Sequence, residues 1–191
     1  MGGRGGNSGM GTGTTSMTPA QFDRYVRENG TEVMYRGYSA SSQEELEQRT
    51  NELLTGTHRE SGEHTSASGR GLYFANNEAE ASGYVTRRQG EQGHQYGNVA
   101  TATLRKDAKI ADPNTLANLY GQKSNEAGDL MSRAFSAYKT NPGEAERLGR
   151  QSDTLRNMDI GTYAKSKGYD ALKTAFGETV VLNQKKVIYR R

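Results

Sequence analysis

The segment 71–84, GLYFANNEAEASGY, constrains the fold of this chain more than any other stretch. Its apolar run at 72–75 has the character of a short buried strand, two asparagines provide a turn, and the helix formers at 78–81 follow. A strand that leads directly into a helix packs that helix against its own sheet. Tyr73 and Tyr84, with ten residues between them, therefore predict two facing rings, a slot for a flat, electron-poor ring.

The composition limits the size of the core around this segment. Of the 191 residues, 24 are glycine and only 32% are hydrophobic, so one modest core with loop-rich surroundings is expected. Residues 1–17 are mostly Gly, Ser and Thr, which predicts a flexible tail. Residues 18–191 are expected to form a single domain. The sequence has no cysteine, which excludes disulfides and cysteine-ligated metal sites.

Charge and hydropathy point to no particular partner. A formal net charge of +3 is too small to indicate nucleic acid by itself. No apolar run is long enough to predict a transmembrane helix, and no secretory signal is expected at the N-terminus. His58, His64 and His94 have no metal-ligand spacing, so no metal site is expected and all three are interpreted as solvated loop residues.

Helix and strand signals alternate through the first half of the chain. Thr18 and Pro19 have the character of a helix start with a capping box at Gln21, and Asn29-Gly30 ends that helix. Other predicted elements are a strand at 32–38, a helix at 41–54, a polar loop at 55–69, a polar stretch at 86–98, a strand at 99–104 and an extended piece at 109–112.

The second half is expected to be a helical insert followed by strands. The insert, 114–167, is predicted to break at Gly121, at 141–143 and at Gly161, and to lie peripherally because it is polar outside a few apolar faces. Strands are predicted at 169–173, 179–182 and 186–189. The run 179–182 is continuously apolar, as in a central strand, and Glu178 stands at its start. A carboxylate there requires a partner or a function.

Arg36 and Gly37 at a strand end, the tyrosine pair and Glu178 resemble, in this order, the ADP-ribosyltransferase superfamily. The Gly71-x-Tyr73 start and the Tyr-x10-Tyr spacing are similar to its diphtheria-toxin-like branch. The strand pair after Gly168 looks like that of phage-borne members, and the glycine-rich residues 1–5 resemble the tails of phage minor-head-associated proteins. The resemblance covers roughly 32–188 and leaves out the helical insert.

One departure separates this chain from that branch. Its Tyr-His-Gly motif reads Tyr35-Arg36-Gly37 here, and the arginine is typical of the cholera-toxin-like branch. That branch also has a Ser-Thr-Ser motif, which is absent here, and an acid or glutamine where this chain has Phe176. The pattern is therefore a hybrid, and it leaves open which residue of a target would receive ADP-ribose.

The resemblance implies an α+β fold, a split β-sandwich of two small sheets with flanking helices, and NAD as a substrate. Cleavage of the bond between nicotinamide and ribose passes through an oxocarbenium-like transition state. The resemblance makes Glu178 the catalytic carboxylate, which would hold a ribose hydroxyl. Arg36 would bind a phosphate or ribose oxygen, the backbone of Gly37 would pair with the nicotinamide carboxamide, and Tyr73 and Tyr84 would enclose the ring.

The resemblance also implies a setting. The expected activity is mono-ADP-ribosylation of a macromolecule, with protein as the first expectation and nucleic acid left open, by a phage or bacterial effector or toxin. The site of action would be the bacterial cytoplasm, after delivery or from a virion, and an antitoxin or immunity partner is unknown. The helical insert is expected to recognise the target.

Other interpretations remain open at the level of sequence. An NAD glycohydrolase, an RNA 2'-phosphotransferase of the same fold, or a non-catalytic phage structural or interaction module would share these motifs. Taken singly, each residue also has a simpler explanation. Arg36 fits a strand-end ion pair, Tyr73 a core tyrosine, Tyr84 a helix residue packed on a sheet, and Glu178 a turn residue.

Overall fold

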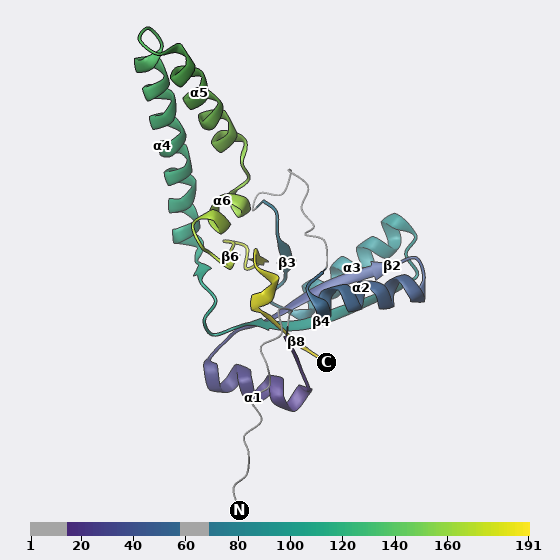
Figure 1. Ribbon diagram of the computed structural model, residues 1–191. Coiled ribbons are helices and arrows are strands. Elements are labelled where there is room, and N and C mark those ends of the chain that lie inside the picture. Colours follow the sequence, from purple (N-terminus) through teal and green to yellow (C-terminus); the bar gives the residue numbers. More distant parts are fainter. Residues whose placement is uncertain (1–14, 58–68) are drawn as a thin grey trace, which may run out of the picture.

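The chain folds into a mixed α+β body from which a pair of long helices projects (Figure 1). The computed structural model describes residues 15–57 and 69–191. The described strands form two four-stranded sheets. The predicted α+β class with two small sheets is therefore confirmed.

The first sheet is long and twisted. Its spatial order is β1 (Thr15–Met17), β8 (Val187–Arg190), β4 (Tyr96–Leu104) and β2 (Val33–Ala40). β1 runs parallel to β8, and the other neighbours are antiparallel. The tail predicted over 1–17 therefore ends in a strand, because the backbone of residues 15–17 finds a partner in β8; residues 1–14 lie outside the described part.

The second sheet is smaller and is built around the most apolar strand. Its order is β3 (Leu72–Phe74), β7 (Thr179–Val181), β6 (Ala171–Lys173) and β5 (Ile110–Ala111). β7 is buried along its whole length, as its continuous apolar run predicts. A single β-bridge between Tyr35 and Ala75 connects this sheet to β2.

One hydrophobic core lies between the two sheets. Phe74 of the second sheet and Tyr189 of the first meet with their ring centroids 6.4 Å apart. The core also contains side chains from β2, β4, β8, β3, β6, β7 and the helix α2: Met34, Tyr38, Leu53, Leu72, Ala102, Leu104, Ala171, Val181 and Val187. Their burial holds the sheets face to face, at about 25 cal/mol for each Å² of apolar surface removed from water.

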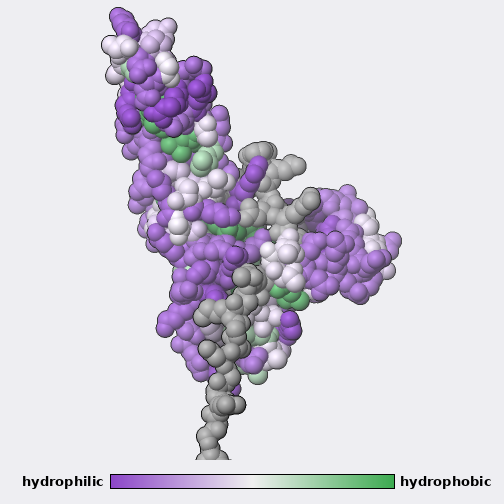
Figure 2. Space-filling view, viewed as in Figure 1, coloured by the Kyte–Doolittle hydropathy of each residue, from purple (hydrophilic) through white to green (hydrophobic). Residues whose placement is uncertain are grey.

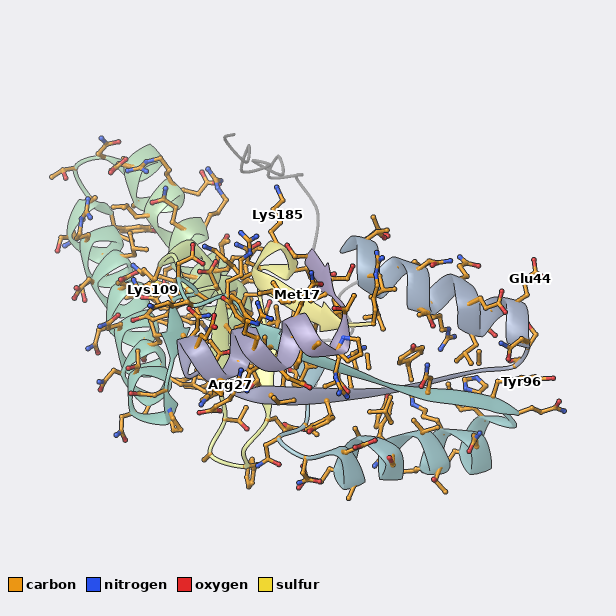
Figure 3. All side chains as sticks on the ribbon, turned by 90° about the horizontal axis from the view of Figure 1, so that it is seen from below. Met17, Arg27, Glu44, Tyr96, Lys109 and Lys185 are labelled. Atoms are coloured by element: carbon orange, nitrogen blue, oxygen red, sulfur yellow. The ribbon has the colours of Figure 1, made fainter. Side chains whose placement is uncertain are left out.

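Three helices flank the first sheet. α1 (Pro19–Asn29) begins with the predicted capping box, in which the Thr18 N–H donates to Gln21 Oε1 at 3.1 Å, and it ends at Gly30 with φ 62°. α2 (Gln43–Thr55) and α3 (Glu78–Gln92) lie on opposite faces of the β2–β4 pair (Figure 3). α3 is the helix that the segment 71–84 predicts.

The projecting arm consists of α4 (Pro113–Ala137) and α5 (Pro142–Asn157), and α6 (Ile160–Ser166) returns the chain to the body (Figure 1). The break predicted at 141–143 occurs slightly earlier, at 138–141, because Asn141 is the N-cap of α5 and Pro142 its first residue. The break predicted at Gly121 is wrong, because α4 continues through it; one helical glycine costs only about 1 kcal/mol relative to alanine. The break predicted at Gly161 is also wrong. Gly161 lies inside α6, where a side chain would collide with the carbonyl of Arg70.

The base of this helical region belongs to the body. A second core lies between the second sheet and the helices α4 and α6, with these buried members: Ala111, Leu116, Leu119, Ile160, Tyr163, Ala164, Leu172, Val180 and Leu182. The predicted peripheral insert at 114–167 is thus peripheral only in its distal part. That part has a mainly hydrophilic surface with a smaller apolar patch (Figure 2). Within the arm, Ser152 Oγ donates to the Ala127 carbonyl at 2.8 Å.

The structure differs from the predicted elements in a few smaller respects. β4 starts at Tyr96, inside the stretch expected to be a polar loop, because it continues its ladder with β2 to Ala40. The short 3-10 helix η1 (Gln184–Lys186) replaces the first residue of the last predicted strand. Of the predicted loop 55–69, residues 58–68 lie outside the described part. No helix among the described residues is long and apolar enough to span a membrane.

The N-cap of α6 fastens the start of the segment that leads into β3. Asp159 Oδ1 accepts from the Thr162 N–H at 3.0 Å and from the Arg70 N–H at 2.9 Å, and Oδ2 accepts from Thr162 Oγ1 at 2.7 Å. Burial alone would raise the pKa of the Asp159 carboxyl, but these hydrogen bonds hold the pKa below its usual range. The ionised form is therefore the one that stabilises the fold.

We expect Asp159→Ala to lower the free energy of unfolding by about 1–2 kcal/mol at pH 7, because it removes a helix cap. Because the folded-state pKa is lowered, this contribution is present above the unfolded pKa of about 4 and is lost as the pH falls through the folded pKa. Urea unfolding at pH 7 and at pH 3 should show the gap between parent and variant closing in acid. Asp153→Ala, at an exposed position of α5, is the control.

Candidate functional site

The edge of β2 that faces β3 pairs with it at one described position, the Tyr35–Ala75 bridge, and the two strands then separate. We call the unpaired part of β2 beyond this bridge the open edge. The Tyr35 N–H donates to the Ala75 carbonyl at 2.9 Å, and the Ala75 N–H donates back at 2.7 Å. Because backbone groups alternate between the two edges of an antiparallel strand, the N–H and C=O of Gly37 and Ser39 face the same edge as those of Tyr35. The Ser39 carbonyl confirms this direction, since it accepts from Arg49 Nη1 of α2 at 2.5 Å.

Gly37 lies between the Tyr35–Ala75 bridge and the hydrogen bond from Arg49 to the Ser39 carbonyl. No hydrogen bond joins its backbone to another described residue at this edge. On the other side of β2 its partner in register is Val99, and by the same alternation these two residues exchange no backbone hydrogen bond. Gly37 is nevertheless buried, and buried backbone groups without a partner are costly. The position therefore offers one donor and one acceptor, side by side, to a ligand.

Glycine is required at position 37 by the packing of α3. A Cβ there would collide with the Ala81 carbonyl and would lie 2.9 Å from Val85 Cγ2. The helix consequently approaches the strand closely, and it covers the face of β2 that carries Tyr35 and Ser39. Sequence analysis identified Gly37 for its backbone, and the structure adds this second reason for a glycine.

Arg36 fills the place where β2 and β3 separate. Its Nη1 donates to the Tyr73 carbonyl at 2.7 Å, and that carbonyl would have faced β2 if the ladder had continued. Burial lowers the pKa of the Arg36 guanidinium, while the nearby hydroxyls of Tyr189 and Tyr84 oppose the shift. The expected contact of Arg36 with a phosphate or ribose oxygen therefore competes with a bond inside the fold.

Tyr84 lies on α3, close enough to Arg36 to influence the pKa of its guanidinium. Val85 and Gln89 pack on Gly97 of β4, so the stripe of Tyr84 and Arg88 lies on the opposite flank of the helix. Arg88 Nε donates to the Tyr84 hydroxyl at 2.9 Å. The guanidinium carbons of Arg87 and Arg88 lie 5.3 and 5.2 Å from the ring centroid, which is cation–π distance.

The tyrosine pair does not form a closed slot by itself. The Tyr73 hydroxyl donates to the Gly69 carbonyl at 2.5 Å, and its half-buried ring packs against the second core. Among the described residues, the ring pair in contact is Phe74 with Tyr189, not Tyr73 with Tyr84. The strand-to-helix unit was therefore predicted correctly, whereas the partners of each ring depend on side chains far away in the sequence.

Glu178 directly precedes β7, the strand that pairs with β3 on the side away from β2. Thr179 pairs with Phe74, so Glu178 comes level with Ala75 at the bridge. With strands about 4.8 Å apart, its backbone is about 10 Å from β2. The side chain is exposed, so it avoids the desolvation cost expected for an acid at the start of a buried strand.

The backbone at Glu178 is fixed by a tight turn. Its N–H donates to Thr174 Oγ1 at 3.2 Å, and its carbonyl accepts from the Thr174 N–H at 2.9 Å. Gly177 completes the predicted turn with φ 87°, a conformation that favours glycine. The carboxylate is thus presented to solvent from a rigid hairpin between β6 and β7.

The structure brings four of the five predicted residues to one edge: Arg36, Gly37, Tyr73 and Tyr84; Glu178 lies beyond β3. Sequence analysis missed Arg87 and Arg88, although arginines three and four positions after a helical tyrosine share its face. His94 lies in the connection between α3 and β4, as predicted, but it is half-buried, and its Nδ1 is 2.8 Å from Ser39 Oγ. His58 and His64 lie outside the described residues. No cluster of metal-ligating side chains occurs in the described part.

Comparison with protein-family models gives no match to this chain. Searches of curated proteins and of solved structures give no match either.

We expect Arg36→Met to destabilise the protein by about 1–3 kcal/mol, because the Tyr73 carbonyl loses a charged donor in a buried position. For a domain of this size, that corresponds to a decrease in Tm of roughly 2–4 °C for each kcal/mol. Thermal unfolding followed by circular dichroism measures it. Arg27→Met, at an exposed position of α1 (labelled in Figure 3), should change Tm little. Equal Tm values for both variants would contradict the role of Arg36 as a tie between β2 and β3.

Proposed function

We propose that this protein is an NAD-dependent mono-ADP-ribosyltransferase with a split β-sandwich of the ADP-ribosyltransferase kind. The observation that carries the proposal is the open edge of β2 at Gly37, between the Tyr35–Ala75 bridge and the Arg49–Ser39 hydrogen bond. A second support is the connection of two small sheets by that single bridge, next to a strand-to-helix unit with the Tyr-x10-Tyr spacing.

The nicotinamide carboxamide is complementary to this edge. It has an amide NH2 group that donates and a carbonyl oxygen that accepts. The C=O and N–H of Gly37 offer the matching acceptor and donor, and no side chain obstructs them. Tyr84 stands beside the edge and supplies an aromatic face for the ring, which is cationic in NAD. Arg36 connects the two strands where they separate, through its hydrogen bond to the Tyr73 carbonyl.

Glu178 is the carboxylate proposed to promote bond cleavage. In the reaction, the bond between the ribose C1' and the nicotinamide nitrogen breaks, and its electron pair leaves with neutral nicotinamide. The carboxylate accepts a hydrogen bond from a ribose hydroxyl and stabilises the positive charge that develops at C1'. A nucleophilic atom of the target then bonds to C1' and loses its proton. The exposed position of Glu178 leaves room for a macromolecular target beside the ribose.

The acceptor on the target stays open in this proposal. Phe176, which stands where one branch of the superfamily has an acid, is highly exposed at 87% of its surface. The hairpin therefore presents no second carboxylate two residues before Glu178 that could activate a guanidinium nucleophile. A phage or bacterial effector acting in a bacterial cytoplasm is the proposed setting, on the basis of the motif resemblance alone.

We expect Glu178→Gln to reduce nicotinamide release by about 100-fold or more, because a neutral amide stabilises the developing positive charge poorly. The measurement uses NAD labelled in the adenylate part, incubated with the protein and bacterial lysate: the label shows whether ADP-ribose is transferred to protein, and chromatography measures the nicotinamide released. The matched control is Glu146→Gln, an exposed carboxylate of α5 paired with Arg150.

Three outcomes distinguish the candidate functions. Label on protein supports transfer, free nicotinamide without labelled protein supports an NAD glycohydrolase, and no turnover by the parent supports a non-catalytic interaction module. If Glu178→Gln transferred ADP-ribose as fast as the parent, the catalytic assignment would be wrong.

The distal arm is proposed to select the target. Excising residues 129–150 and joining Gly128 to Gln151 through a short glycine linker should leave NAD cleavage unchanged, because the Ser152–Ala127 hydrogen bond and the second core are kept. Labelling of the normal target in lysate should be lost or redirected. Loss of both activities in a variant with parental Tm, or retention of both, would contradict this role.

A further inference from the structure

Cationic side chains gather around Tyr84. Arg87 and Arg88 both lie over its ring, and Arg36 is close enough for Arg88 to lower the pKa of its guanidinium. Within the described part of the chain, no carboxylate forms an ion pair with Arg87 or Arg88. Glu91, one turn further along α3, pairs with neither, although its spacing would allow it.

This arrangement favours an anion at the open edge. The guanidinium groups of Arg36, Arg87 and Arg88 carry like charges and repel one another. Burial strengthens this repulsion because water screens buried charges less. Arg88 is half-buried, so part of its guanidinium has already lost water. An incoming group with two or more negative oxygens would relieve the repulsion and would accept the fork of N–H donors that arginine presents.

We infer that Arg88, assisted by Arg87, binds the diphosphate of a dinucleotide at the open edge of β2. When Arg88 turns from Tyr84 to the diphosphate, it uncovers the ring face of Tyr84. The inference rests on the proposed function in that the dinucleotide is taken to be NAD. It assigns the diphosphate to the α3 arginines in place of Arg36, the residue that sequence analysis favoured.

Arg36 is less suited to this task because its Nη1 is engaged with the Tyr73 carbonyl inside the fold. Among the described residues, Arg88 interacts with the hydroxyl and the ring of Tyr84, its neighbour on the same helix face. Exchanging that neutral hydroxyl for a charged phosphate oxygen strengthens the hydrogen bond. The cationic nicotinamide ring and the arginines also compete for the same aromatic face, so removal of Arg88 to the phosphates makes room for the ring.

Equilibrium binding tests the inference with three probes: NAD, ADP and nicotinamide riboside. ADP has the diphosphate without nicotinamide, and nicotinamide riboside has the cationic ring without phosphates. We expect Arg88→Gln to weaken NAD and ADP binding by about tenfold, since one charge-assisted contact is worth roughly that factor. Binding of nicotinamide riboside should stay the same or tighten. Arg88→Lys should recover part of the ADP affinity, and Arg27→Gln is the control on the remote surface of α1.

Equal ADP affinity for Arg88→Gln and the parent, or no ADP binding by the parent, would overturn the inference. Weakening of all three probes by the same factor would also overturn it, because Arg88 would then only position Tyr84. The proposed function is judged separately, by nicotinamide release from NAD. Arg88-dependent ADP binding without release would support the anion site and refute the transferase. Nicotinamide release together with ADP binding that does not depend on Arg88 would support the transferase and refute the anion site.

Discussion

Arg36 donates a hydrogen bond to the Tyr73 carbonyl at the place where β2 and β3 separate, and the geometry of the open edge depends on it. Without this bond the two strands would either continue their ladder, which would consume the backbone of Gly37, or leave the Tyr73 carbonyl without its donor. A guanidinium is long enough to span the widening gap and remains charged even when buried. The same residue thus joins the two sheets and keeps them apart, and in the described part of the chain their backbones pair at the Tyr35–Ala75 bridge.

α3 supplies the other wall of the edge. Its close approach depends on the missing Cβ of Gly37, and this approach is what brings Tyr84 and Arg88 beside the opening. The cationic surroundings of Tyr84 follow from one helical stripe and one strand residue. Arg87 and Arg88 belong to the same helix as Tyr84, whereas Arg36 approaches it only because β2 lies beneath that helix. The proposed site for an anionic group next to a flat cationic ring is derived from this arrangement.

The helical region after Pro113 has two parts with different roles. Its base is inseparable from the body, since Leu116, Ile160 and Tyr163 complete the second core against the sheet that holds Glu178. Asp159 of the same region caps α6 and fastens the segment leading into Tyr73. The distal arm contributes nothing to that core and projects beyond it (Figure 1). Stability and site geometry therefore depend on the base, which leaves the distal arm available for recognition.

The sequence by itself determined the elements whose signals are local: the capped helix α1, the strand-to-helix unit around Tyr73, the apolar strand β7 and the turn at Gly177. These follow from capping residues, hydrophobic periodicity and glycine conformation, which act within a few residues. It could not determine that α4 passes through Gly121, that residues 15–17 pair with β8, or that the rings of Tyr73 and Tyr84 have separate partners. Each of these was decided by contacts between segments distant in the sequence, whose energies outweigh local preference. The open edge at Gly37 is the clearest case, because it exists only where two sheets, one helix and one half-buried arginine meet.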